Sequence, residues 1–292
     1  MQSYTHTPVL LKEVLRELLL GPGTRHVDGT LGGGGHAAAV LKAGAPDSWL
    51  GGSDRDGAAL AAARERLTEY GDRCELRRAD FSELSKWIGA ASVDSVLLDL
   101  GVSSPQLDVP TRGFSFQSDG PLDMRMDDRQ ELTAERLVNE SGEEELAHWI
   151  WKLGGERQSR RIARAIVRER EQVRIETTGR LSALVVSALP RRGGRLHPAT
   201  RVFQAIRMVV NNELELLQKG LRSAMEILKP GGRLLVITFH SAEARTVKEF
   251  GDTMTREEIM RWVRRKVVKA SELEKVTNPR ARSAQLRVLE RI

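Results

Sequence analysis

A run of four glycines is the feature of this sequence best suited to chemistry. It lies in "DGTLGGGGH" at residues 28–36, between a short apolar segment and an alanine-rich one. Backbone N–H groups approach a ligand closely only where no Cβ intervenes, and a helix beginning near His36 directs its partial positive charge to the same place. Gly32, Gly34 and Ala37 fit the G-x-G-x-x-A pattern. The segment therefore predicts a nucleotide-type site, without distinguishing NAD from another adenosine-containing cofactor.

Two carboxylates are expected beside the glycines. Asp54 ends a second apolar segment, about 20 residues after Gly34, where an acid accepts hydrogen bonds from ribose hydroxyls, whereas Asp56 is expected to cap the following helix. Asp99 ends the apolar segment "VDSVLLDLG". Because ligands bind at the carboxyl ends of parallel strands, we expect Asp99 to face the cofactor or an amino group of the substrate. The alternative for Asp99 is to cap the turn that follows it.

The segments that carry these residues alternate between strand and helix patterns. Apolar runs predict strands, and alanine-rich runs that stop at Gly44 and Gly71 predict helices. The expected strands span residues 25–29, 48–56, 73–81 and 93–101, and the expected helices span 36–44 and 56–71. Fully apolar strands alternating with helices indicate an α/β fold with a doubly wound, mostly parallel sheet.

The alternation stops after residue 103 and resumes after residue 207. The residues between them are rich in turns and predict helices at 134–139, 143–152, 156–171 and 178–188, with no convincing strand. The later part predicts a long helix within 211–232, a strand at 233–240, a helix at 241–250 and a pair of further strands at one edge of the sheet, around 264–270 and 283–292. We therefore expect a discontinuous core of residues 1–105 and 207–292, with a helical insertion at 106–206.

Composition indicates a globular protein without a membrane anchor. No run of about 18 apolar residues occurs, and residues 1–23 have an amphipathic helical pattern rather than that of a signal peptide, so a cytoplasmic location is expected. The single cysteine, Cys74, excludes a disulfide framework and a cysteine-based zinc site. No pair among the six histidines has the helical spacing of metal ligands, so no metal is expected.

Positive charge is concentrated in one part of the chain. The net charge is +6 overall, but residues 152–210 alone hold 14 Lys and Arg against 4 Asp and Glu. Arginines there recur at three- and four-residue spacing beside an apolar stripe of Ile162, Ala165 and Ile166. This clustering indicates a polyanionic partner, and the alternative is a solvated helix face. The arginines concerned are Arg157, Arg160, Arg161, Arg164 and Arg168, then Arg191, Arg192, Arg195 and Arg201, with Arg280 and Arg282 further along the chain.

Several motifs together resemble one family. They are "YTHTPVL" at 4–10, "DGTLGGGGH" at 28–36, "SDRD" at 53–56, "LLDLGVSSPQLD" at 97–108 and "RGFSFQSDGPLDMRMD" at 112–127, followed by "GERQSRRIARAIV", "HPATRVFQAIR", "ITFHS" and "NPRARSAQLRVLER". Over nearly its whole length, and in the same motif order, the chain resembles the MraW/RsmH family. These are bacterial S-adenosylmethionine-dependent 16S rRNA (cytosine-N4)-methyltransferases.

The resemblance implies a Rossmann-like class I methyltransferase core, S-adenosylmethionine as cofactor, and 16S rRNA in the small ribosomal subunit as partner, with a cytidine of the decoding region as target. Carried over position by position, the cofactor contacts fall on Gly34, Gly35, His36, Asp54, Phe81, Asp99 and Gln106. For Phe81 the alternative is core packing, and for His36 it is packing at the start of the helix. We hypothesise that Asp99 is also the catalytic residue, which accepts a hydrogen bond from the cytosine amino group.

Other functions are compatible with parts of the pattern. An NAD-dependent oxidoreductase would have the same glycine loop and acid, although the Asp99 turn and the terminal strand pair suit it less. A noncatalytic RNA-binding protein would bind RNA without turning over a cofactor. A small-molecule methyltransferase would leave the arginine-rich insertion without a purpose. The low aromatic content does not favour an extended stacking platform for single strands, and a homodimer is compatible with the sequence.

Overall fold

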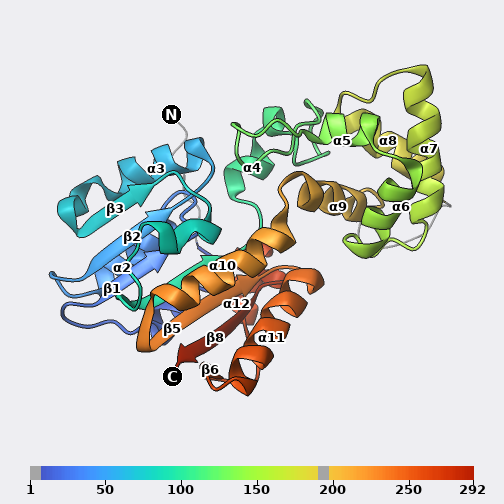
Figure 1. Ribbon diagram of the computed structural model, residues 1–292. Coiled ribbons are helices and arrows are strands. Elements are labelled where there is room, and N and C mark those ends of the chain that lie inside the picture. The colour runs from blue at the N-terminus through green and yellow to red at the C-terminus, as the bar shows by residue number, and fades with distance from the viewer. Residues whose placement is uncertain (1–7, 190–196) are drawn as a thin grey trace. The chain divides into compact units, whose positions relative to one another are not determined.

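The computed structural model describes residues 8–189 and 197–292, and the chain divides into two compact units (Figure 1). The first unit contains the described residues up to Gly101 together with Leu214–Ile292, and the second is Val102–Glu213. The boundaries expected from the sequence were 105/106 and 206/207. They assign residues 102–105 and 207–213 to the core, whereas the structure assigns these residues to the second unit. These residues belong to the helical unit because they include the first residues of α4 and the last turn of α9.

The first unit is built on one mixed sheet. Its strands are β1 (Arg25–Asp28), β2 (Trp49–Ser53), β3 (Cys74–Arg77), β4 (Val93–Asp99), β5 (Leu228–Thr238), β6 (Met260–Trp262), β7 (Val268–Lys269) and β8 (Gln285–Arg291). The order is β3-β2-β1-β4-β5-β8-β6, with the short β7 also paired to β8. Strands β1 to β5 pair in parallel, and β8 runs antiparallel to β5, β6 and β7.

Helices cover both faces of this sheet. They are α1 (Leu11–Glu17), α2 (Gly35–Ala43), α3 (Gly57–Leu67), α10 (Glu213–Ile227), α11 (Ser241–Arg256) and α12 (Glu272–Thr277), with short 3-10 turns η1 (Thr68–Arg73), η2 (Phe81–Lys86) and η4 (Pro279–Arg282). Alternate strand residues enter different cores: Leu97 packs in a cluster with α2 and α3, and Leu98 in a cluster with α10 and α11. The predicted doubly wound α/β fold is confirmed.

The ends of several elements differ from the sequence-based expectation. Strand β5 begins at Leu228, before Pro230 and the glycines that were expected to end the preceding helix, and it stops at Thr238. His240 does not continue the strand, because it is the N-cap of α11. Strand β6 was not predicted, since three residues are too few for a recognisable alternation. The N-terminal helical pattern forms a helix only over Leu11–Glu17 within the described residues.

The second unit is helical. It contains α4 (Ser104–Asp108), η3 (Pro110–Arg112), α5 (Ala134–Glu140), α6 (Glu143–Lys152), α7 (Ser159–Gln172), α8 (Thr178–Ala188) and α9 (Thr200–Val210). Its own core joins buried side chains of α5 to α9, among them Leu146, Ile162, Leu181 and Phe203. Helix α9 was not predicted, and α7 begins at Ser159 rather than at residue 156. A self-contained core is what an inserted unit of this size requires.

No helix in the described part of the chain is long and apolar enough to cross a membrane.

Candidate active site

The glycine loop connects the end of β1 to the start of α2. Gly32 and Gly34 have φ values of +52° and +74°, a left-handed conformation that side chains with a Cβ rarely adopt. The Gly34 N–H donates to the Leu31 carbonyl at 2.8 Å, which turns the chain into the helix. A Cβ on Gly33 would meet no atom within 4 Å, so the space beside the loop at this residue is open. The loop thus presents bare backbone at a helix N-terminus, as predicted.

Gly35 has a different surrounding from its neighbours. A Cβ at this residue would lie 2.7 Å from Cγ of Pro8, so glycine is required here by close packing of the segment that precedes α1. His36 serves the same segment, because its Nε2 lies 3.0 Å from the Val9 carbonyl oxygen and therefore donates to it. The imidazole is 6 % exposed. In this structure the His36 side chain therefore packs at the start of the helix, which is the alternative interpretation of this residue.

Asp54 braces the loop from the end of β2. Its Oδ2 accepts a hydrogen bond from the Gly32 N–H at 2.8 Å, and its Oδ1 accepts one from the Asp56 N–H at 2.8 Å. Burial raises the pKa of Asp54 to about 6, although these two hydrogen bonds oppose the shift. Asp56 caps α3 by accepting from the Ala58 N–H at 3.0 Å, which confirms the role predicted for it.

Asp99 lies at the end of β4, beside the glycine loop. Its Oδ2 is 3.6 Å from Nδ1 of His36, and its backbone N–H donates to the Thr30 hydroxyl at 2.6 Å. The other oxygen, Oδ1, is buried and accepts no hydrogen bond from any residue that the structure describes. Burial raises the pKa of Asp99 well above its ordinary value, and the carboxyl groups of Asp28 and Glu243 raise it further. An acceptor of this kind favours a ligand that supplies a hydrogen-bond donor or a positive charge.

Two more acids at this edge were not singled out from the sequence. Asp28 ends β1, is 3 % exposed, and accepts a hydrogen bond from the Thr30 N–H at 3.1 Å. Burial raises its pKa to about 7, and Asp54 contributes to the rise. Asp28 could have been identified from the sequence, because it is the last residue of an apolar strand directly before the glycine loop.

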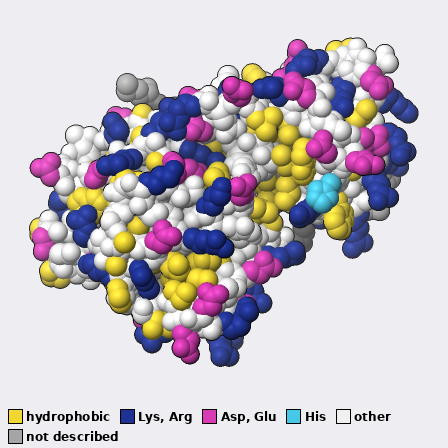
Figure 2. All heavy atoms as spheres, in the orientation of Figure 1, with side chains coloured by type: hydrophobic (Ala, Val, Ile, Leu, Met, Phe, Trp, Pro, Cys, Tyr) yellow, Lys and Arg dark blue, Asp and Glu magenta, His cyan; other side chains and the backbone are white. Residues whose placement is uncertain are grey.

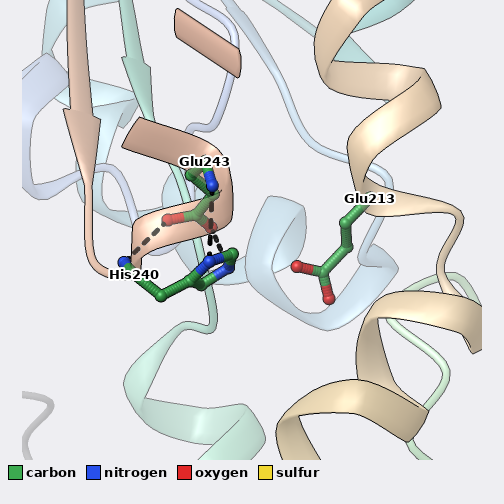
Figure 3. Close-up of side chains that lie close together, drawn as sticks. All are labelled: Glu213, His240 and Glu243. Carbon is green, nitrogen blue, oxygen red and sulfur yellow. Dashed lines mark hydrogen bonds and ion pairs between the residues drawn. The ribbon is translucent and has the colours of Figure 1, made fainter. Parts of the chain in front are cut away.

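Glu243 is the second of these acids, and it follows β5. Its Oε2 accepts from the Phe239 N–H at 2.8 Å. The same oxygen accepts from the His240 N–H at 3.2 Å, and Oε1 lies 3.0 Å from Nε2 of His240 (Figure 3). Glu243 is 3 % exposed. Its position three residues inside a helix that begins after a strand was a readable capping-box signal. Asp28, Asp99 and Glu243 therefore form an acidic cluster at the carboxyl edge of the sheet, with Asp54 next to Asp28.

Phe81 is buried rather than presented at the surface. The residue is 9 % exposed and belongs to the core cluster that packs against α10. A Cβ added to Gly220 of that helix would lie 2.1 Å from Cδ2 of Phe81, so the ring lies directly against the helix backbone. In this structure the Phe81 ring therefore packs in the core, which is the alternative interpretation of this residue. A cofactor contact of the ring stays a prediction.

Gln106 belongs to the helical unit, whereas the other predicted cofactor residues belong to the first unit. Its Oε1 accepts from the Ser103 N–H at 2.9 Å and completes the capping box of α4. The side chain is 5 % exposed. This local role explains why a glutamine is suited to the position, and a cofactor contact of Gln106 stays a prediction.

The predicted basic face lies on α7. Arg160, Arg161, Arg164 and Arg168 are exposed, and Ile162, Ala163 and Ile166 are the buried residues opposite them. Lys and Arg side chains gather along the part of the helical unit that contains α7 (Figure 2). Two details were wrong: Arg157 precedes the helix, and Ala163 rather than Ala165 completes the buried stripe. Arg191, Arg192 and Arg195 lie outside the described residues.

The arrangement fits a cationic nucleoside cofactor. The loop offers open backbone at Gly33, and the acidic cluster includes a buried oxygen of Asp99 that lacks a hydrogen-bond partner in the described chain. The sheet continues the order of a dinucleotide-binding fold up to β5 and then inserts the reversed strand β8 before β6. Fold and site together define a Rossmann-like class I methyltransferase.

The family follows from comparison with known proteins. Residues 3–292 match the model of the MraW methylase family, and the chain belongs to that family. It is 46 % identical to ribosomal RNA small subunit methyltransferase H of Symbiobacterium thermophilum, over 99 % of this chain and 98 % of the relative. The proteins of the same name from Syntrophotalea carbinolica and Cyanothece sp. are each 47 % identical, over 99–100 % of this chain and 96–99 % of the relatives.

The predicted enzyme class, an S-adenosylmethionine-dependent methyltransferase, is confirmed by this membership, and the oxidoreductase alternative is not favoured.

Proposed function

We propose that the protein transfers a methyl group from S-adenosylmethionine to the exocyclic N4 of a cytidine in the decoding region of 16S rRNA. The relatives' names supply the substrate class, ribosomal RNA of the small subunit. The observation that carries the site assignment is the Asp99 carboxyl at the end of β4, with one buried oxygen that has no partner among the described residues. A single acceptor of this kind beside a cofactor loop suits an amino-group substrate.

The first unit supplies the residues that would hold the cofactor. The backbone of the loop at Gly33 is accessible to a ligand, and Asp54 can still accept ribose hydroxyls because each carboxylate oxygen has a second lone pair. Asp28 and Asp99 end β1 and β4 at this edge, and the positive charges of a bound cofactor would favour the ionised forms of both. When bound, S-adenosylmethionine supplies a methyl group made electrophilic by its sulfonium.

The chemistry requires positioning more than activation. The N4 lone pair is delocalised into the cytosine ring, so N4 must be held in line with the methyl–sulfur bond. A C–N bond forms while the C–S bond breaks, the electron pair of that bond stays on sulfur, and N4 loses one proton. Asp99 accepts the N4–H hydrogen bond and then the proton, a role for which a carboxyl with a raised pKa is suited.

The helical unit supplies the contacts to RNA in this proposal. Arg160, Arg161 and Arg168 are exposed on α7 and can contact phosphates, which offsets the free energy of extruding a base from structured RNA. We infer that the substrate is an assembled or late-stage small subunit and that the enzyme acts in the cytoplasm. A homodimer is not required by this scheme, and sedimentation analysis of the purified protein would decide its oligomeric state.

The Asp99→Asn variant tests the catalytic assignment. Small subunits from cells that lack the protein serve as substrate, and methylated cytidine is measured by mass analysis of the nucleosides. We expect the methyl-transfer rate to fall about 100-fold or more, because the amide cannot accept the proton. Calorimetry on the same variant reports its cofactor affinity separately.

Asp72→Asn is the matched control, because Asp72 is exposed on η1. A near-normal transfer rate in Asp99→Asn would refute the catalytic role. Failure of the wild-type protein to restore the modified cytidine would refute the proposed function itself.

A further inference from the structure

Trp151 is the most exposed tryptophan of the chain. It lies in the last turn of α6, directly after the buried Ile150, and is 61 % exposed. The other four tryptophans are all partly buried. An indole in water leaves a large flat apolar surface unpaired, which suits it to stacking on a planar ligand.

The backbone around Trp151 is held in place. The Trp151 carbonyl accepts from the Gly155 N–H at 3.0 Å, which closes the turn between α6 and α7. A Cβ on Gly154 would lie 2.4 Å from the Arg201 carbonyl oxygen, so the start of α9 packs directly on that turn. The Arg201 guanidinium also donates to the Gly155 carbonyl at 3.4 Å. The indole is therefore presented from a fixed base.

The surroundings of Trp151 are cationic. Lys152 follows it, Arg157 lies in the turn, and Arg160 and Arg161 lie in the first turn of α7, all with exposed side chains. In the described part of the chain, no carboxylate forms an ion pair with any of these four. Further along α7, by contrast, Arg164 lies 3.6 Å from Glu143 of α6. Four exposed cations without an ion-pair partner among the described residues thus lie in the ten residues that follow this aromatic side chain.

We propose that Trp151 is a stacking platform for an unpaired base of single-stranded RNA, with Lys152, Arg157, Arg160 and Arg161 on the flanking phosphates. The inference rests on the proposed function, since it takes RNA as the substrate. In a single strand of nucleic acid, planar bases alternate with phosphate groups. This surface offers one indole that can stack on a base and cations that can contact the phosphates. A protein partner would favour a continuous apolar patch, but the exposed neighbours of Trp151 on α6 are His148 and Lys152.

The test compares Trp151→Ala and Trp151→Phe in binding a labelled oligocytidylate of about ten nucleotides, measured by fluorescence anisotropy over a range of salt concentrations. We expect the alanine variant to lose about fivefold or more in affinity and the phenylalanine variant to lose less, because a ring preserves stacking. The slope of log K against log salt should not change in either variant, because no charge is removed. Heparin, which has no bases, should bind the wild type and Trp151→Ala equally.

Val173→Ala is the matched control, because Val173 is 52 % exposed at the other end of α7. Equal oligonucleotide affinities of wild type and Trp151→Ala would overturn the proposal, and so would an equal loss with heparin. If the assembled subunit shields Trp151 from fluorescence quenchers and the oligonucleotide does not, the proposal would be overturned in favour of a protein partner. These measurements involve no methyl transfer, so they can fail while the subunit assay succeeds.

Discussion

Replacing Asp28 by asparagine should stabilise the ligand-free protein at alkaline pH. Asp28 is 3 % exposed, and burial raises its pKa from 3.8 to about 7, with a further contribution from Asp54. Because the pKa in the folded state lies above that in the unfolded state, the folded protein holds this proton more tightly. The resulting stability is complete below pH 3.8, decreases as the pH rises through 7, and is lost above it.

The size of the effect follows from the shift. At 1.36 kcal/mol per pKa unit, the rise from 3.8 to about 7 corresponds to about 4 kcal/mol, of which roughly 2–3 kcal/mol falls between pH 5 and pH 8. Asparagine does not titrate, and its oxygen can still accept the Thr30 N–H. The free energy of unfolding of the variant relative to wild type should therefore increase by that amount over this range.

Urea unfolding of both proteins at pH 5, 6, 7 and 8 measures this difference, and subtraction removes most of the titration of the other acids. Asp72→Asn, at an exposed residue, should show no such trend. A variant that is less stable than wild type at pH 8, or a difference independent of pH, would refute the reasoning. The first result would mean that Asp28 is stabilised as a carboxylate in the folded protein, and the second that folding leaves its pKa unchanged.

Three further predictions concern other parts of the molecule. Gly220→Ala should lower the free energy of unfolding by about 1–3 kcal/mol, because its Cβ would lie 2.1 Å from Phe81; an unchanged urea midpoint would contradict this packing. Asp54→Asn should weaken cofactor binding about tenfold or more in calorimetry, because an amide replaces only one of the two acceptors for Gly32 and Asp56; a wild-type Kd would contradict it. Changing Arg160, Arg161 and Arg168 together to glutamine should reduce the salt slope of single-stranded RNA binding by about 2 and leave cofactor affinity unchanged; an unaltered slope would exclude them as phosphate contacts.

Most of the parallel part of the fold was predictable because its inner strands β1, β2 and β4 are largely buried between helices. Helix α2 also ended before an expected glycine, Gly44. Other boundaries differed, because α3 ended at Leu67 rather than near Gly71 and the glycines after Pro230 lie inside β5. Helix α9 lacked a local signal for its start, because its N-cap, Ala199, makes no side-chain capping hydrogen bond. Its apolar spacing, with Val202, Phe203, Ile206 and Val210 buried, was nevertheless readable.

The candidate site was predictable where a residue type is required by backbone geometry. Gly34 and Asp56 are of this kind, since one adopts a left-handed conformation and the other caps a helix. The sequence did not reveal that Phe81 packs against Gly220, because that contact joins residues far apart in the chain. It likewise did not reveal that Asp99 and Glu243 approach one another, since their coupling depends on the pairing of β4 with β5.

The position of the helical insertion has a consequence for how the chain folds during its synthesis. Strand β4 ends at Asp99, and its neighbour β5 begins only at Leu228. At translation rates of about 5–20 residues per second, β5 is synthesised on the order of 10 s after β4. During that interval the backbone N–H and C=O groups at the free edge of β4 are unpaired and its apolar side chains are uncovered, while the helical unit, which has its own core, can already fold. The nascent chain is therefore most prone to aggregate, and most in need of a chaperone, before its last quarter has left the ribosome.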